Sequence, residues 1–305
     1  MAVYVNTNVS SLNGRRYLNN VQNQLTTTYQ RLSSGMRINS AKDDAAGLQI
    51  SSRLTTQING LNQGNRNSSD GIALAQTVEG GMDEITNMLQ KIRTLAVQAK
   101  NGTNTAEDRT ALSKEATALA DEISRIATST TFGGKKVLDG AGAATLFTKA
   151  QVGGQAVEHT GKLTLQVGAN KGDTIDFNVA GMKLSQIASQ AGLDKAAFEG
   201  IYKDDKILLD DATKIDGIIE GVTKMIAAVD SSRAGLGAIQ NRLESSIRNQ
   251  ANVSANQADA RSRIRDADFA EESANLSQQS IIQQAATSML MQANTRPQLG
   301  LSLLG

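Results

Sequence analysis

Five apolar residues spaced seven apart constrain the fold of this chain more than any other feature. They are Ile215, Val222, Val229, Leu236 and Leu243. A side chain that recurs every seven residues stays on one side of an α-helix, so this seam must pack against a second helix. The only proline is Pro297, so nothing upstream of it forces a break in long helices.

The first third of the chain predicts the partner helices. A helix is expected from about Ser10 to Met36, with a stop or joint at Gly35, and a longer one from Asp43-Asp44 to Asn101-Gly102. Thr105 to Asp108 resembles a capping box that opens a third helix. The apolar stripe of the first helix comprises Leu18, Val21, Leu25, Leu32 and Met36, and the seam of the second begins at Leu54, Ile58 and Leu61.

Residues 131–200 change character. Leu163, Leu165 and Val167 alternate with polar residues, as do Ile175, Phe177 and Val179, and a Gly-rich link at 168–172 separates the two runs. This pattern predicts at least one β-hairpin in a small insert. Helical periodicity is expected to return from about residue 204.

The segment from Ser273 to Thr295 contains no charged residue, yet its five glutamines exclude a membrane helix. It carries an apolar stripe that includes Ile281, Ile282, Met289 and Leu290. Ordering roughly 35 terminal residues costs about 1–2 kcal/mol each in backbone entropy. A buried large apolar side chain contributes about 1.5–3 kcal/mol, and the N-terminal stripe has only five. We therefore expect both ends to order when other copies cover them; the alternative is an amphipathic helix packed on its own domain.

Composition argues against an enzyme. The chain has no cysteine, one histidine (His159) and 3% aromatic residues, so we expect no catalytic, cofactor or metal site. The net charge of +1 gives no reason to expect nucleic acid as a partner, and no apolar run is long enough for membrane insertion. The N-terminus lacks a cleaved secretory signal; a transit peptide is the alternative for residues 1–40, which hold four arginines and no acid.

Two segments are similar to signatures of the bacterial flagellins. Residues 31–50 read RLSSGMRINSAKDDAAGLQI, and residues 260–272 read ARSRIRDADFAEE. The similarity continues through QQA at 283–285 and QAN at 292–294 to the final LSLL. It covers about residues 1–140 and 205–305, whereas residues 141–200 carry no recognisable motif, as expected if the insert varies within the family.

The residue pattern and this resemblance together imply a mainly α fold: an elongated, folded-back helical rod with a small β-containing insert at its distal end. Coiled-coil-like terminal helices would join an α-helical bundle. By resemblance, residues 1–42 and 265–305 would form a filament-core helical domain. Residues 43–135 and 204–264 would form a rod domain, and residues 136–203 a variable, surface-exposed insert.

The resemblance also implies the function. The chain would be the structural subunit of the flagellar filament, exported unfolded by the flagellar type III apparatus and assembled outside the cell to enable motility. Its partners would be other copies of itself, an export chaperone at the C-terminal segment, and the filament cap and hook–filament junction proteins. A coiled-coil signalling adaptor and a hook–filament junction protein are the alternatives.

Flagellins are also recognised by a Toll-like receptor of animal hosts. The resemblance places that surface, which also contacts neighbouring protofilaments, at Lys91, Leu95 and Glu115. Lys91 stands where the family usually has arginine, and Thr94 where it usually has an acid. Packing within the helical seam is the alternative role for Leu95.

Overall fold

The computed structural model describes residues 7–302, apart from 143, 153–154, 204–205, 210 and 212. The chain divides into two compact units. Unit 1 comprises residues 1–58 and 254–305, and unit 2 comprises residues 59–253. The helices α2 (Ala45–Ala99) and α6 (Ile215–Arg265) each contribute residues to both units.

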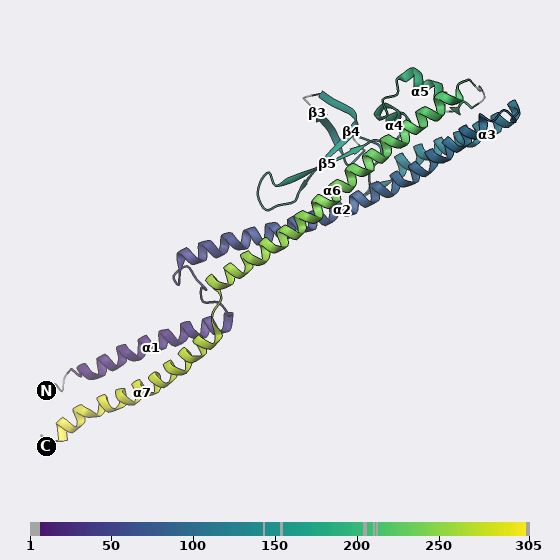
Figure 1. Cartoon of the computed structure of the whole chain (residues 1–305). Helices are drawn as coiled ribbons and strands as arrows, with labels where there is room; N and C mark the ends of the chain where they lie inside the picture. The colour runs from purple at the N-terminus through teal and green to yellow at the C-terminus, as the bar shows by residue number, and fades with distance from the viewer. Residues whose placement is uncertain are drawn as a thin grey trace. The chain divides into compact units, whose positions relative to one another are not determined.

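Unit 1 pairs the first helix of the chain, α1 (Val9–Ser34), with the last, α7 (Phe269–Ser302) (Figure 1). The Asn8 side chain caps the start of α1 by accepting a hydrogen bond from the Ser11 N–H. The helix ends at Gly35, where φ is 69°, a left-handed conformation that favours glycine. The predicted stop at Gly35 is therefore confirmed.

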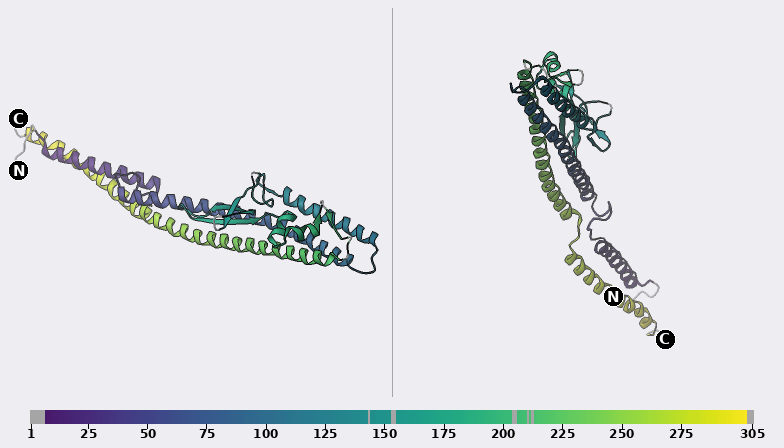
Figure 2. Two further views of the ribbon diagram at one scale, coloured as in Figure 1. Left: turned by 90° about the horizontal axis from the view of Figure 1, so that it is seen from above. Right: turned by 90° about the vertical axis from the view of Figure 1, so that its right-hand side faces the viewer.

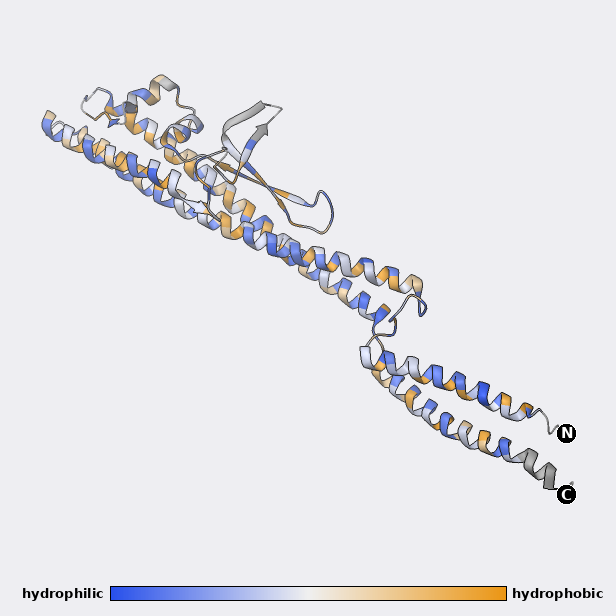
Figure 3. Ribbon diagram, turned by 180° about the vertical axis from the view of Figure 1, so that it is seen from behind, coloured by the Kyte–Doolittle hydropathy of each residue, from blue (hydrophilic) through white to orange (hydrophobic). Residues whose placement is uncertain are grey.

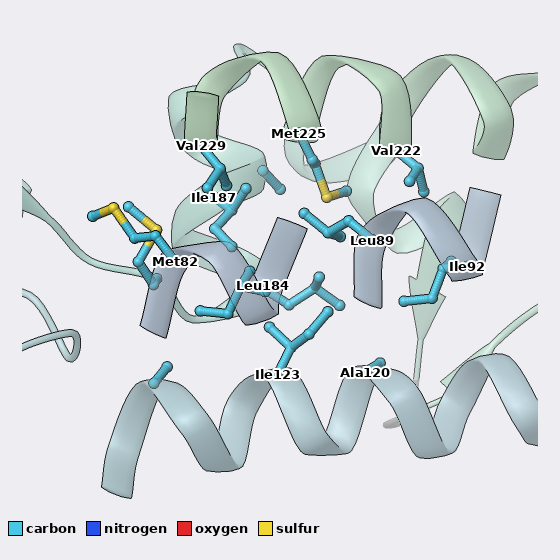
Figure 4. Close-up of a cluster of buried hydrophobic side chains, with 14 of the residues drawn as sticks. Met82, Leu89, Ile92, Ala120, Ile123, Leu184, Ile187, Val222, Met225 and Val229 are labelled. Carbon is cyan, nitrogen blue, oxygen red and sulfur yellow. The ribbon is translucent and has the colours of Figure 1, made fainter. Parts of the chain in front are cut away.

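Unit 2 packs α2 and α6 against α3 (Ala106–Ser129). The capping box predicted at the start of α3 is present, since Thr105 and Asp108 exchange hydrogen bonds between side chain and backbone. Buried side chains from α2, α3, α4 and α6 meet in one core (Figure 4). Those labelled in the figure include Leu89, Ile92, Ile123, Ile187, Val222 and Met225.

The insert adds short strands and two short helices to unit 2. A three-stranded antiparallel sheet has the order β3-β4-β5, with β3 at Thr148–Val152, β4 at Gln155–Gln166 and β5 at Thr174–Ala180. Leu163 pairs with Phe177 and Leu165 with Ile175, which confirms the predicted hairpin. The other elements are β1 (Thr131–Phe132), β2 (Lys135–Lys136), α4 (Leu184–Gln190), α5 (Lys195–Ile201), β6 (Tyr202–Lys203) and β7 (Lys206–Ile207).

The β4–β5 hairpin lies along α2 and α6 (Figure 2). Glycines on α2 allow this close approach: a Cβ at Gly60 would come within 2.7 Å of the Ala169 Cβ, and one at Gly64 would overlap the Val167 carbonyl. The buried Gln250 side chain on α6 donates a hydrogen bond to the same carbonyl oxygen. Both helices therefore hold the turn of the hairpin.

One sequence expectation needs correction. The helical period does not return at 204, because β7 occupies 206–207 and α6 begins at Ile215; the paired acids at 204–205 lie outside the described residues. Two glycines at 133–134 form the turn between β1 and β2, where φ is positive at both. The helices α4 and α5 were not anticipated, since seven residues are too few for a periodic signal.

Candidate assembly surface

Unit 1 buries few apolar side chains and exposes many. Among the described residues, only four of the buried hydrophobic residues belong to it: Val21, Leu25, Ile38 and Ile58. Nine of the eleven exposed large hydrophobic residues also belong to it: Val9, Leu12, Tyr17, Tyr29, Ile50, Phe269, Ile281, Met289 and Met291. Figure 3 shows hydrophobic residues recurring along both helices of the pair. This concentration of exposed apolar residues on one unit makes the helix pair a candidate interaction surface.

Polar contacts hold α1 and α7 in register. Across the pair, Arg31 Nη1 lies 3.1 Å from Glu272 Oε1, and the Glu272 side chain is only 9% exposed. Near the open ends of the helices, Asn8 Nδ2 donates to the Ala293 carbonyl at 2.7 Å, and Ser11 Oγ lies 2.7 Å from Asn294 Oδ1. These bonds hold the two helices in one register. In that register, apolar residues such as Ile281 and Met289 are exposed.

An open groove of about 1010 Å³ runs between the two helices. Its lining is mostly apolar and has no charged side chain; it includes Gly14, Tyr17, Ile282, Ala286 and Met289. Gly14 contributes to the close packing of the pair, because a Cβ there would lie 3.1 Å from Leu290 Cδ1. A groove with this lining suits an apolar side chain of another polypeptide.

The loop between α1 and α2 is held by one carboxylate. The backbone N–H groups of Ser40 and Asn39 donate to Asp43 Oδ2 at 2.9 and 3.1 Å, and these bonds hold the Asp43 pKa below its usual value of 3.8. Backbone bonds then tie this segment to the α6–α7 junction: Ala267 N donates to the Gly35 carbonyl at 3.0 Å, and Arg37 N to the Arg265 carbonyl at 2.7 Å.

Comparison with known proteins assigns this architecture to a family. The model of the bacterial flagellin N-terminal helical region matches residues 5–143, and that of the C-terminal helical region matches residues 219–304. Flagellin D of Vibrio anguillarum is 38% identical, and polar flagellin B/D of Vibrio parahaemolyticus is 39% identical; each alignment covers 100% of both chains. This chain belongs to the bacterial flagellin family.

As a flagellin, the chain is a structural subunit of the extracellular flagellar filament, where it polymerises with copies of itself. A structure of a putative flagellar hook-associated protein from Vibrio parahaemolyticus matches with a TM-score of 0.55 and 17% identity. That match covers 73% of this chain and 100% of the other, and it shows the fold alone. The mainly helical fold with a small β insert, expected from the sequence, is confirmed. The adaptor interpretation is set aside.

The flagellin's predicted terminal stripes are only partly used within one subunit. Val21 and Leu25 on α1 are buried. Leu18, Leu32 and Met36 on the N-terminal side, with Ile282 and Leu290 on α7, are half-buried. Ile281 and Met289 remain 67% and 72% exposed. The structure thus brings one side of each stripe together and leaves the other side to solvent.

The predicted rod seam, which runs from unit 1 into unit 2 on α2, lies mainly inside the subunit. Ile215, Val222, Val229, Leu236 and Leu243 on α6 are all buried. On α2, Ile58 is buried while Leu54 and Leu61 are half-buried. Sequence reasoning missed the exposed aromatic residues Tyr17, Tyr29 and Phe269, although the flagellin-like segments contain Phe269.

The three residues predicted for receptor and protofilament contact differ in exposure. Lys91 on α2 and Glu115 on α3 are exposed. The Leu95 side chain is 9% exposed and belongs to the core of unit 2, in agreement with the packing alternative.

Other kinds of site have no basis in the described part of the chain. Its residues include no group of three or more His, Cys, Asp or Glu placed to hold a metal ion. None of the helices formed by these residues has the length and apolarity needed to cross a membrane.

Proposed function

We propose that α1 and α7 are the assembly module of this flagellin and complete their packing only in the filament. The concentration of exposed apolar residues in unit 1, beside only four buried ones, carries this proposal. Each exposed side chain gains about 1.5–3 kcal/mol on full burial, so contacts with neighbouring copies add to the packing that stabilises the two ordered helices.

The domain roles follow from this module. Residues 1–42 and 265–305 would form the filament core, residues 43–135 and 204–264 the surrounding rod, and residues 136–203 an insert on the outer surface. The rod role is supported by the buried α6 seam, which lets unit 2 keep its shape without neighbours. The division into units within α2 and α6 supports separate roles for the two parts.

Export and assembly would use the same terminal segments. The subunit would leave the cell unfolded through the flagellar type III apparatus and join the tip of the filament. An export chaperone would cover the C-terminal segment, where Ile281, Met289 and Met291 are exposed and residues 273–295 carry no charge. Cap and hook–filament junction proteins would contact the ends of the filament.

Recognition by a host Toll-like receptor is a second proposed role. Lys91 and Glu115 are exposed and can contact a partner directly. Leu95 would support this surface from the core beneath it. Lysine at position 91 offers a point charge in place of the planar guanidinium that the family usually has, so we expect a weaker polar contact there.

The assembly proposal is tested by Met289→Gln, with Val253→Gln on the exposed surface of unit 2 as the matched control. Monomers would be seeded with filament fragments, and the critical concentration for growth would be measured. Met289→Gln should raise it by about tenfold or more, because the side chain no longer contributes apolar burial. Thermal unfolding of monomeric unit 2 should not change. Equal growth of both variants would contradict the proposal.

A further inference from the structure

Phe269 is a large aromatic residue that unit 1 does not bury. It is the first residue of α7, and its side chain is 66% exposed. Among the described residues, the aromatic ring contacts involve Phe147 with Phe177 and Phe198 with Tyr202, all in unit 2. Large exposed aromatic residues are typical anchors of protein interfaces, because their burial in a pocket contributes much of the binding energy.

Phe269 cannot fill the groove of its own subunit. The groove lies between α1 and α7 near Tyr17 and Met289, and Met289 is 20 residues beyond Phe269 on α7. At about 100° per residue, 20 residues bring the two side chains to roughly opposite sides of the helix. The ring and the groove are therefore separate patches on different sides of the helix pair.

The charges around the two patches are complementary. Exposed carboxylates flank the ring at Asp266, Asp268 and Glu271. Arg15 and Arg16 are exposed and stand in the sequence between Gly14 and Tyr17, which line the groove. No acid on α1 and no charge at 273–295 on α7 offsets their positive charge. Opposite charges at the rims of two patches orient their encounter and favour this pairing over a contact of two like patches.

We propose that Phe269 of one subunit seats in the α1–α7 groove of a second copy of this chain. The inference rests on the proposed assembly role of α1 and α7 and names one contact within it. Because the ring and the groove are different patches, the contact is head-to-tail and leaves a free ring and a free groove at the two ends. Such a contact repeats without closing into a dimer.

The contact also fixes a displacement between copies. The two large apolar side chains that α7 contributes to the groove are Ile282 and Met289, 13 and 20 residues beyond Phe269. At about 1.5 Å per residue, neighbouring copies with parallel helix pairs are offset by roughly 20–30 Å along α7. Ser10 on α1 also lines the groove. Ser273 follows Phe269 by about one helical turn, so with this offset Ser273 of one copy lies near Ser10 of the next.

Cysteine cross-linking in assembled filaments tests the contact, because the natural chain has no cysteine. The variant Ser273→Cys/Ser10→Cys replaces two hydroxyls by thiols of similar size. Each subunit would bond to two neighbours on oxidation, so a non-reducing gel should show a ladder of dimers, trimers and longer species. The control is Ser273→Cys/Ser288→Cys, since exposed Ser288 precedes Met289 but does not line the groove. It should give little cross-linking.

A second measurement uses Phe269 itself. Phe269→Ala should raise the critical concentration for seeded growth by about tenfold or more, while Phe269→Tyr should keep it close to the parent value. The exposed ring contributes little to the monomer, so both variants should fold normally. If the double-cysteine variant does not form filaments, the critical concentrations of the two Phe269 variants test the proposed contact.

Three outcomes would overturn the proposed contact. They are filaments of the cysteine variant with no ladder, cross-linking that stops at dimers, or an unchanged critical concentration for Phe269→Ala. Normal growth with no ladder would leave the general assembly role of α1 and α7 intact, whereas failure of the Met289→Gln test would remove that role itself.

Discussion

Replacing Gly64 by alanine should separate the β4–β5 hairpin from α2. The new Cβ would overlap the Val167 carbonyl oxygen and lie 2.8 Å from the carbonyl carbon, and these backbone atoms cannot rotate away. Moving the turn exposes Val167 and breaks its hydrogen bond with the buried Gln250. Losing the buried valine costs about 1.5–3 kcal/mol and the unpaired amide about 1–3 kcal/mol. Alanine recovers about 1 kcal/mol of helix propensity. The net destabilisation of unit 2 is roughly 1.5–5 kcal/mol.

Gly80→Ala is the matched control on the same helix. Gly80 is exposed, and a Cβ there meets nothing within 4 Å, so only the propensity gain of about 1 kcal/mol remains. Thermal unfolding of the monomers, followed by circular dichroism, compares the two. For a unit of this size, 1 kcal/mol shifts Tm by about 2–4 °C. Gly80→Ala should raise Tm and Gly64→Ala should lower it. A Gly64→Ala protein that melts at or above the parent would refute the docking of the hairpin.

Three further predictions concern the cap, the C-terminal helix and the receptor surface. Thr105→Ala should destabilise unit 2 by about 1 kcal/mol at pH 7 in urea titrations. The bonds that the backbone N–H and the hydroxyl of Thr105 donate hold the Asp108 pKa below its usual 3.8, so the part of the cap that depends on the ionised Asp108 is complete above that pH and is lost as the pH falls through the lowered value. The difference between the two proteins should therefore shrink at low pH without vanishing, because the bond from the Asp108 N–H to the Thr105 hydroxyl does not depend on that charge. Deleting residues 273–305 should abolish filament growth while unit 2 still melts cooperatively; a missing transition would show that the two units depend on each other. Leu95→Asp should impair both receptor signalling and motility, because it places a charge in the core, and unfolding should show a loss of about 3 kcal/mol or more. Unchanged motility and stability would exclude a packing role.

The sequence by itself determined the long helices and several of their ends. Spacing of seven between Ile215 and Leu243 predicted one buried seam, because a helix repeats its faces every seven residues whatever its surroundings. The stop at Gly35 and the cap at Thr105 follow from bonds within a few residues. Alternation in the two runs around residues 168–172 likewise predicted the β4–β5 pairing. All these features depend on interactions between near neighbours in the chain.

Only the tertiary structure decided which apolar residues this subunit covers itself. Leu95 and Met289 both belong to apolar stripes, yet one is 9% exposed and the other 72%. A periodic pattern marks a face that needs covering but does not say whether the same chain or another copy covers it. The docking of the hairpin on Gly64 and the isolation of Phe269 likewise depend on contacts between distant segments. Burial depends on the packing of all segments together, so only the tertiary structure showed which apolar residues unit 2 buries and which ones unit 1 leaves exposed.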